Sequence, residues 1–134
     1  MATQIFVNLP VKDLKKSIEF FTSLGYTFNK QFTDEKAGCL VISETIFAML
    51  LMEPFFKSFT DREICDTSKA NEALIALSTE SRKDVDDLVD KAVKAGAKEP
   101  KPAQDHGFMY SRGFQDLDGH VWEALYMDPS HIQQ

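Results

Sequence analysis

The side chains that most often bind metals or transfer protons, histidine and cysteine, are scarce in this sequence, with three His and two Cys among 134 residues. His106 lies in the polar stretch 104–107, and we expect it in a loop, at the rim of a cavity. His120 follows Gly119, and a side chain at a turn usually bonds to backbone or solvent. Neither position by itself indicates a catalytic imidazole.

The two cysteines, Cys39 and Cys65, are too few for a disulfide scaffold or a multi-cysteine zinc site. Both have apolar neighbours, and a free cysteine in such surroundings usually packs as a small apolar residue. The first ten residues lack the basic start of a signal peptide, and the longest apolar run, 46–52, is far shorter than a membrane span. We therefore expect a cytoplasmic protein that does not enter the membrane.

The charge balance excludes a further class of partner. Fifteen Lys and Arg against 21 Asp and Glu give a net charge of −6, and no basic cluster is present. Nucleic-acid binding requires a basic face that neutralises phosphates, and an anionic membrane would repel this chain. A length of 134 residues with 43% hydrophobic residues suits one compact domain, or two small modules that share a core.

The first half of the chain reads as strand, helix and three strands. Residues 5–9 predict a strand stopped by Pro10, and residues 13–24 carry apolar side chains at helical spacing up to a terminal Gly25. Residues 26–32, 38–42 and 45–52 predict three further strands, separated by polar turns.

The second half repeats this order. Residues 73–79 predict a strand, and Ser81 is a natural N-cap for a helix over 81–95 that closes at Gly96. Residues 108–114 and 120–127 predict strands joined by the turn 116–119. We therefore predict two βαβββ modules, residues 1–53 and 73–134, in a single structural domain.

The segment between the modules, residues 54–72, is unusually aromatic and has two interpretations. It is a linker with a short helix that covers a sheet edge, or it is a lid or a subunit contact. Phe55, Phe56 and Phe59 favour the second interpretation because they need somewhere to be buried. On this basis we expect a homodimer.

Two motifs, VKDLKKSIEFFTSLGY at 11–26 and DLDGHVWEALY at 116–126, occur in a βαβββ repeat. Together they resemble the vicinal-oxygen-chelate superfamily of glyoxalases, bleomycin-resistance proteins and extradiol dioxygenases, and more narrowly its glyoxalase-related bacterial members. The resemblance implies an α+β fold in which two modules form one curved mixed sheet around a cavity, with the helices on the outer face. It also implies a small-molecule ligand.

The resemblance further implies four strand positions that hold a divalent metal, and only Glu123 matches a ligand type. The other three fall on Phe6, on or beside Leu74, and in the run 49–51, none of which supplies imidazole or carboxylate. A metal site needs about three protein ligands. Ni, Zn, Mn or Fe is therefore possible but disfavoured, and Glu123 is a metal ligand only if a metal binds.

The carboxylate of Glu123 would be costly to bury on an apolar cavity wall unless it were paired, and Arg112 is the nearest candidate partner. Glu123 is therefore either the catalytic residue of the cavity or one half of an ion pair. Trp122 alternates with Glu123 along the strand, so we expect it on the helix side, in the core. The residues expected to line the cavity with Glu123 are Phe6, Asn8, Leu74 and Tyr110, with His106 at the rim.

Three functions follow. The first is a lyase- or isomerase-type enzyme that uses Glu123 as a base and has lost most of its metal site. The second is a metal-independent, resistance-type binding protein that sequesters a small molecule, for which an aromatic cation suits the net charge and the many Phe residues. The third is a domain that acts only by association.

Overall fold

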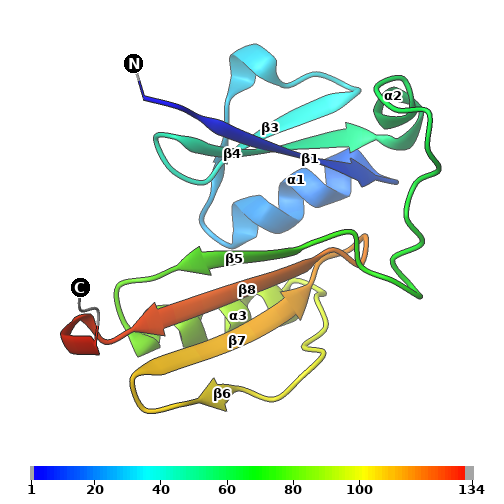
Figure 1. Ribbon diagram of the computed structural model, residues 1–134. Helices are drawn as coiled ribbons and strands as arrows, with labels where there is room; N and C mark the ends of the chain where they lie inside the picture. The colour runs from blue at the N-terminus through cyan, green and yellow to red at the C-terminus, as the bar shows by residue number, and fades with distance from the viewer. Residues whose placement is uncertain (1, 132–134) are drawn as a thin grey trace. The chain divides into compact units, whose positions relative to one another are not determined.

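The first module of the computed structural model, which describes residues 2–131, holds four strands and two helices (Figure 1). In chain order they are β1 (Ile5–Val11), α1 (Leu14–Ser23), β2 (Thr27–Phe28), β3 (Ala37–Val41), β4 (Ile46–Met52) and α2 (Glu53–Lys57), with a 3-10 turn at Lys30–Phe32.

The second module repeats the order with one helix. Its elements are β5 (Leu74–Ser78), α3 (Arg82–Lys94), β6 (Gln104–Asp105), β7 (Met109–Gln115) and β8 (Val121–Met127), followed by a 3-10 turn at Pro129–His131. The chain divides into two compact units between Cys65 and Asp66, inside the segment 54–72. Each unit is described by itself.

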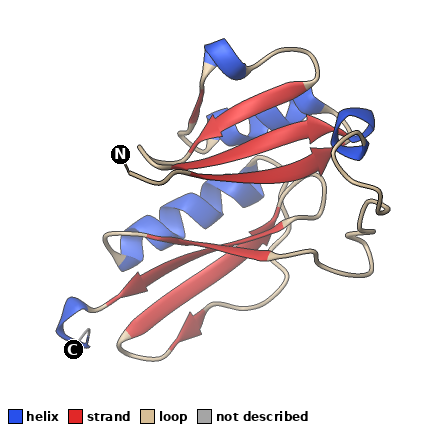
Figure 2. Ribbon diagram, turned by 45° about the horizontal axis from the view of Figure 1, so that its top comes forward, coloured by secondary structure: helices blue, strands red, loops and turns tan. Residues whose placement is uncertain are grey.

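Each module has its own four-stranded mixed sheet (Figure 2). The strand orders are β1-β4-β3-β2 and β5-β8-β7-β6, and in both sheets the first pair is parallel and the other pairs are antiparallel. The predicted α+β fold of two βαβββ modules is confirmed. The hydrogen bonds of residues 2–131 form two sheets rather than the single sheet predicted. The strands β1 and β5 are edge strands, and each pairs only with one strand of its own sheet.

Both long helices begin and end at the predicted signals. The side chains of Asp13 and Ser81 each accept a hydrogen bond from the backbone N–H three residues further on, at 3.2 and 3.1 Å. Gly25 and Gly96 follow the helices with φ of +106° and +115°, the left-handed conformation that glycine adopts at low cost.

The core of the second module lies between α3 and one face of its sheet. Val85 and Val89 of α3 are fully buried, and so are Phe114 of β7 and Trp122 of β8. The predicted position of Trp122 on the helix side is confirmed. Because side chains alternate along a strand, the opposite face of this sheet is left to other residues.

Two strand predictions were wrong. Strand β1 continues through Pro10 to Val11, which is possible because an edge strand bonds on one side only and does not need every N–H. The predicted strand 26–32 shortens to two residues, because the Asn29 side chain accepts the N–H of Gln31 at 2.9 Å and starts a 3-10 turn. Strand β6 was missed because it is only two polar residues long.

No helix among residues 2–131 is long and apolar enough to span a membrane.

Candidate small-molecule pocket on the second module

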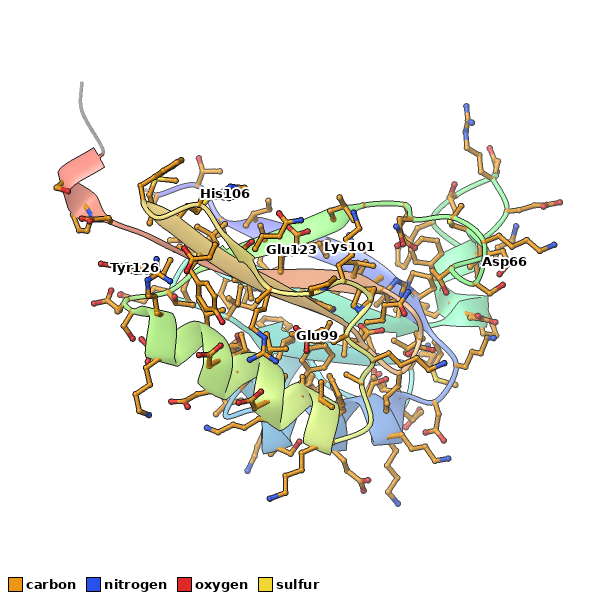
Figure 3. All side chains as sticks on the ribbon, turned by 90° about the horizontal axis from the view of Figure 1, so that it is seen from below. Asp66, Glu99, Lys101, His106, Glu123 and Tyr126 are labelled. Carbon is orange, nitrogen blue, oxygen red and sulfur yellow. The ribbon has the colours of Figure 1, made fainter. Side chains whose placement is uncertain are left out.

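The register of the second sheet decides which residues share a face with Glu123. Glu123 of β8 lies opposite Gly113 of β7 and beside Ala76 of β5. Its neighbours along β8, Trp122 and Ala124, are buried beneath α3. Glu123 therefore points to the face away from the helix, as Figure 3 shows.

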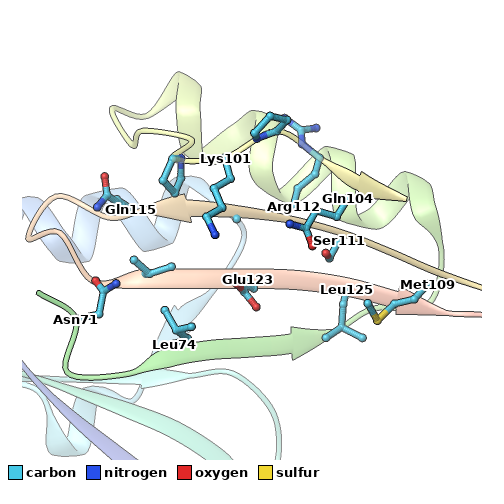
Figure 4. A pocket seen from close by; sticks show the side chains of 14 residues that line it. Asn71, Leu74, Lys101, Gln104, Met109, Ser111, Arg112, Gln115, Glu123 and Leu125 are labelled. Atoms are coloured by element: carbon cyan, nitrogen blue, oxygen red, sulfur yellow. The ribbon is translucent and has the colours of Figure 1, made fainter. Parts of the chain in front are cut away.

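This face carries a pocket of about 430 Å³ (Figure 4). Its apolar wall comes from four strand side chains, Leu74, Met109, Val121 and Leu125, and from the two prolines that flank Lys101. Its polar wall holds one carboxylate, one free ammonium, one guanidinium and several neutral groups: Glu123, Lys101, Arg112, Asn71, Gln104, Ser111 and Gln115. An apolar pocket with a few polar groups is typical of small-molecule sites.

Gly113 of β7 lies close to β8 and forms part of the pocket wall. A Cβ at this position would lie 3.2 Å from the carbonyl oxygen of Trp122, a tight fit, and 3.6 Å from Cγ of Glu123, an ordinary contact. A glycine inside a strand often marks a place where another group approaches closely, and this signal in the sequence could have indicated the pocket wall.

The ion pair between Glu123 and Arg112, one of the two alternatives considered for Glu123, does not form. Arg112 reaches toward α3, where its guanidinium donates two hydrogen bonds of 2.9 Å to Glu99 and one of 2.9 Å to Asp86. The bonds from Arg112 lower the pKa of Glu99, and the pKa of Asp86 is lowered first by a hydrogen bond from Tyr110 and then by that from Arg112. Glu123 pairs with Gly113 of β7 and shares its face of the sheet. Because side chains alternate along β7, the neighbouring Arg112 starts from the opposite, helix-facing side. Among the described residues the Glu123 side chain has neither a hydrogen bond nor an ion pair.

Lys101 is held over the pocket by a short, constrained loop. It stands between Pro100 and Pro102, and proline fixes the backbone angle φ. Just before the loop, the backbone of Lys98 exchanges hydrogen bonds of 2.7 and 3.2 Å with Gln115 of β7. In Figure 4 the Lys101 side chain extends from this loop across β7 toward Glu123.

Two of the predicted cavity residues are elsewhere in this module. Tyr110 lies on the opposite face of the sheet from Glu123, contrary to the prediction, and its hydroxyl donates a 2.7 Å hydrogen bond to Asp86 of α3. It is an even-numbered residue of a strand whose odd-numbered residues face the pocket. His106 is exposed in the turn before β7, with its backbone N–H bonded to Met109, and is not in contact with the pocket. Leu74, 61% exposed, and Glu123 do line one pocket.

The remaining predicted residues, Phe6 and Asn8, belong to the first module. The ring of Phe6 stacks on Phe47 with the centroids 4.9 Å apart. Asn8 lines a different pocket, with Leu51 and with Phe56 and Phe59 from the segment after β4.

A buried polar cluster fixes the hairpin next to the pocket. His120 is 1% exposed, and its Nδ1 lies 3.2 Å from the carboxylate of Glu72. The imidazole is therefore buried beside a carboxylate, whereas a contact with backbone or solvent had been expected. Asp116 accepts the indole N–H of Trp122 at 2.9 Å, and burial raises the pKa of this carboxyl. Because Glu72 adjoins Asn71 in sequence, the contact with His120 places Asn71 at the pocket rim.

The donor set does not fit a divalent metal. Residues 2–131 contain no group of three or more His, Cys, Asp or Glu side chains that could hold one. The other polar side chains that line the pocket are amides, a hydroxyl, the ammonium of Lys101 and the guanidinium of Arg112, and cationic groups close by oppose the binding of a further cation. The pocket can bind and orient an organic molecule, and its one carboxylate can accept a proton or pair with a cation.

Comparison with known proteins agrees with this fold. Similar solved structures include a hypothetical protein from S. aureus, with 28% identity, 94% of each chain covered and a TM-score of 0.79. A glyoxalase/bleomycin resistance protein/dioxygenase family enzyme from Burkholderia phytofirmans has 16% identity, covers 94% of this chain and 99% of its own, and gives a TM-score of 0.77.

The fosfomycin resistance protein FosX from Mesorhizobium loti has 14% identity, with 97% of this chain and 96% of FosX covered and a TM-score of 0.69. No curated protein matches the chain significantly. The model of the Glyoxalase/Bleomycin resistance protein/Dioxygenase superfamily matches residues 4–124. Since that match covers most of the sequence, the chain belongs to the glyoxalase/bleomycin resistance/dioxygenase superfamily.

Proposed function

We propose that the pocket of the second module binds a small organic molecule without a metal, and that Glu123 pairs with a cationic group of that molecule. The observation that carries this proposal is the half-buried carboxylate of Glu123, which has no partner among the described residues. An unpaired carboxylate beside apolar side chains costs stability, so a ligand that supplies its counter-charge gains binding energy there.

The size and composition of the pocket support a ligand of this kind. A volume of about 430 Å³ is in the range of roughly 300–1,000 Å³ usual for small-molecule sites. Leu74 is largely exposed although it is apolar, and an aromatic ligand would cover it. A resistance-type role in sequestering a small molecule is also supported by the name of the superfamily and by that of FosX, a fosfomycin resistance protein.

Nuclear magnetic resonance of the ¹⁵N-labelled protein with EDTA present tests the proposal. An aromatic amine should shift the amide signals of β7 and β8, and Glu123→Gln should weaken binding. Glu44→Gln, an exposed carboxylate in a turn of the first module, is the matched control and should bind like the unaltered protein. Binding that requires added Ni, Zn, Mn or Fe, or stoichiometric metal that disappears in Glu123→Gln, would contradict the proposal.

A second candidate is a lyase or isomerase activity in which Glu123 transfers a proton. The same unpaired carboxylate favours it, because a general base must be free to reach the substrate. Glyoxalase-type isomerisation of the methylglyoxal–glutathione adduct should nevertheless be slow or absent, since the donors around Glu123 do not fit a metal. Robust metal-dependent turnover of that adduct would refute this expectation.

We also propose that the protein is a cytoplasmic homodimer. The exposed aromatic side chain of Phe59 supports the dimer, because an isolated aromatic surface gains stability when a partner covers it. Light scattering at micromolar protein should give twice the 15.2 kDa chain mass, and a monomer mass would contradict the proposal.

A further inference from the structure

We infer that the ligand of the second-module pocket is a zwitterion: an apolar amino acid or a close analogue, whose ammonium pairs with Glu123 and whose carboxylate pairs with Lys101. This inference rests on the proposed function and adds the second charge. Its basis is that the ammonium of Lys101 and the carboxylate of Glu123 line the same pocket and form no ion pair with each other.

Lys101 is the cation available to such a ligand. The other basic residue on the pocket, Arg112, is bound on the helix side to Glu99 and Asp86, and also to Asp90 at 3.0 Å. The Lys101 side chain has no hydrogen bond or ion pair with any described residue. Its loop is constrained by the two flanking prolines, so the backbone that carries this side chain requires little ordering when a ligand binds.

Lys101 and Glu123 also form no ion pair with each other, although Figures 3 and 4 show both on the same side of the sheet. A molecule placed between them meets an ammonium at one end and a carboxylate at the other. A ligand with only one charge would satisfy one group and leave the other partly desolvated. A ligand with both charges would satisfy both.

The apolar part of the ligand has a place on the same wall. Leu74, Val121 and Leu125 come from neighbouring strands and form a continuous apolar surface beside Glu123. An aromatic or branched aliphatic side chain would bury this surface, and free glycine would not. The pocket therefore favours apolar amino acids over small polar ones.

Three probes on one carbon frame test the inference: phenylalanine carries both charges, 2-phenylethylamine only the ammonium, and 3-phenylpropionate only the carboxylate. Dissociation constants are measured by NMR titration at pH 7 with EDTA for the unaltered protein, Lys101→Met and Glu123→Gln. Lys98→Met is the matched control, because Lys98 joins the same loop through its backbone and is not in contact with the pocket.

Phenylalanine should bind roughly tenfold more tightly than either single-charge probe, the factor expected for one further charge-assisted contact. Lys101→Met should weaken phenylalanine and phenylpropionate and leave phenylethylamine unchanged. Glu123→Gln should weaken phenylalanine and phenylethylamine and leave phenylpropionate unchanged or tighter. For each variant, unchanged amide signals from residues outside the loop would show that the protein still folds.

Two results would overturn the inference in distinguishable ways. If phenylethylamine binds in the pocket and Lys101→Met weakens no probe, the proposed cation site stands and the zwitterion inference fails. If none of the three probes shifts a pocket signal at millimolar concentration, both the inference and the proposed function fail.

Discussion

The ion-pair network of Arg112 allows a quantitative prediction. In the second module its guanidinium contacts three carboxylates, with both oxygens of Glu99 bonded at 2.9 Å. The Arg112 side chain is only 14% exposed, whereas Glu99 is 26% and Asp86 43% exposed. Substitution Arg112→Met keeps an apolar stem of similar length and removes the charge, which leaves three carboxylates close together without a cation.

Burial decides how large the effect is. Breaking a fully buried ion pair costs about 3–5 kcal/mol, and an exposed pair contributes only about 0.2–1 kcal/mol. Arg112 is nearly buried but its partners are partly solvated, so we expect Arg112→Met to lower the free energy of unfolding by ~2 kcal/mol, between these limits. Lys83→Met is the control, because Lys83 forms a 2.8 Å pair with Asp87 on the same helix and is 82% exposed. It should cost far less than Arg112→Met, because an exposed pair is screened by solvent.

The loss should depend on pH. The pKa of Glu99 is lowered below its ordinary value of 4.5 by Arg112, and that of Asp86 below 3.8 first by Tyr110 and then by Arg112. A carboxyl group whose pKa is lowered on folding contributes stability above its ordinary pKa, and that stability is lost as the pH falls through the lower, folded value. The destabilisation by Arg112→Met should therefore be full at pH 7 and smaller at pH 3.

Urea unfolding followed by Trp122 fluorescence measures both effects, since the midpoint and slope give the free energy of unfolding. Trp122 is buried beneath α3 and reports on the same module. If Arg112→Met costs no more than Lys83→Met at pH 7, the network does not stabilise the module. If its cost is the same at pH 3 as at pH 7, the assignment of the pKa shifts to Arg112 is wrong.

Two further predictions concern the loops of the second module. Gly119→Ala should destabilise the protein by about 1 kcal/mol more than Gly107→Ala. Both glycines have φ of +82°, but a Cβ at 119 would lie 2.5 Å from Oγ1 of Thr67, whereas a Cβ at 107 meets nothing within 4 Å. Equal melting temperatures of the two variants would contradict this prediction. The pKa of Asp105 is lowered to about 2, first by the hydrogen bond from Arg82 and then by the Gly107 N–H. Arg82→Met should move the pKa of Asp105, measured by titration of its carboxyl ¹³C signal, toward 3.8, and an unchanged pKa would contradict the assignment to Arg82. The stability linked to this pair is present above pH 3.8 and is lost as the pH falls through about 2.

Signals local in sequence predicted the fold well. The N-caps Asp13 and Ser81 and the glycines after both helices act within a few residues, so their effect is readable from the chain alone. The alternation of apolar and polar residues correctly placed Trp122 in the core. The errors occur where a local contact overrides a strand pattern, as Asn29 does in the 3-10 turn after β2.

The site was harder to predict because it depends on which residues of neighbouring strands share a face. In the hairpin between β7 and β8, Glu123 pairs with Gly113. The odd-numbered residues of β7 therefore share the face of Glu123, and the even-numbered Arg112 and Tyr110 lie on the helix face. Lys101 was missed for a different reason: it lies in a loop without periodicity, and only the backbone pairing of Lys98 with β7 brings it to the pocket.

The two modules share one strand pattern but use the face away from the helix differently, and this explains why the carboxylate stands in the second. In the first sheet Met49 pairs with Asn8 of the parallel edge strand, as Glu123 pairs with Ala76 in the second. Strand β4 runs directly into α2, which contacts β1 and β4 and brings aromatic side chains beside Leu51. Position 49 is half-buried, and a carboxylate there would lie beside these aromatic side chains and lose part of its hydration.

After β8, by contrast, the described chain forms only a short 3-10 turn, tied by the N–H of Asp128 to the carbonyl of Phe108. Through residue 131 no helix of the second module returns over the face of Glu123. Glu123 can therefore stay half-exposed and unpaired at a cost the fold tolerates. In this protein the charged, ligand-accessible group thus stands on the sheet whose last strand, as far as the chain is described, is not followed by a covering helix.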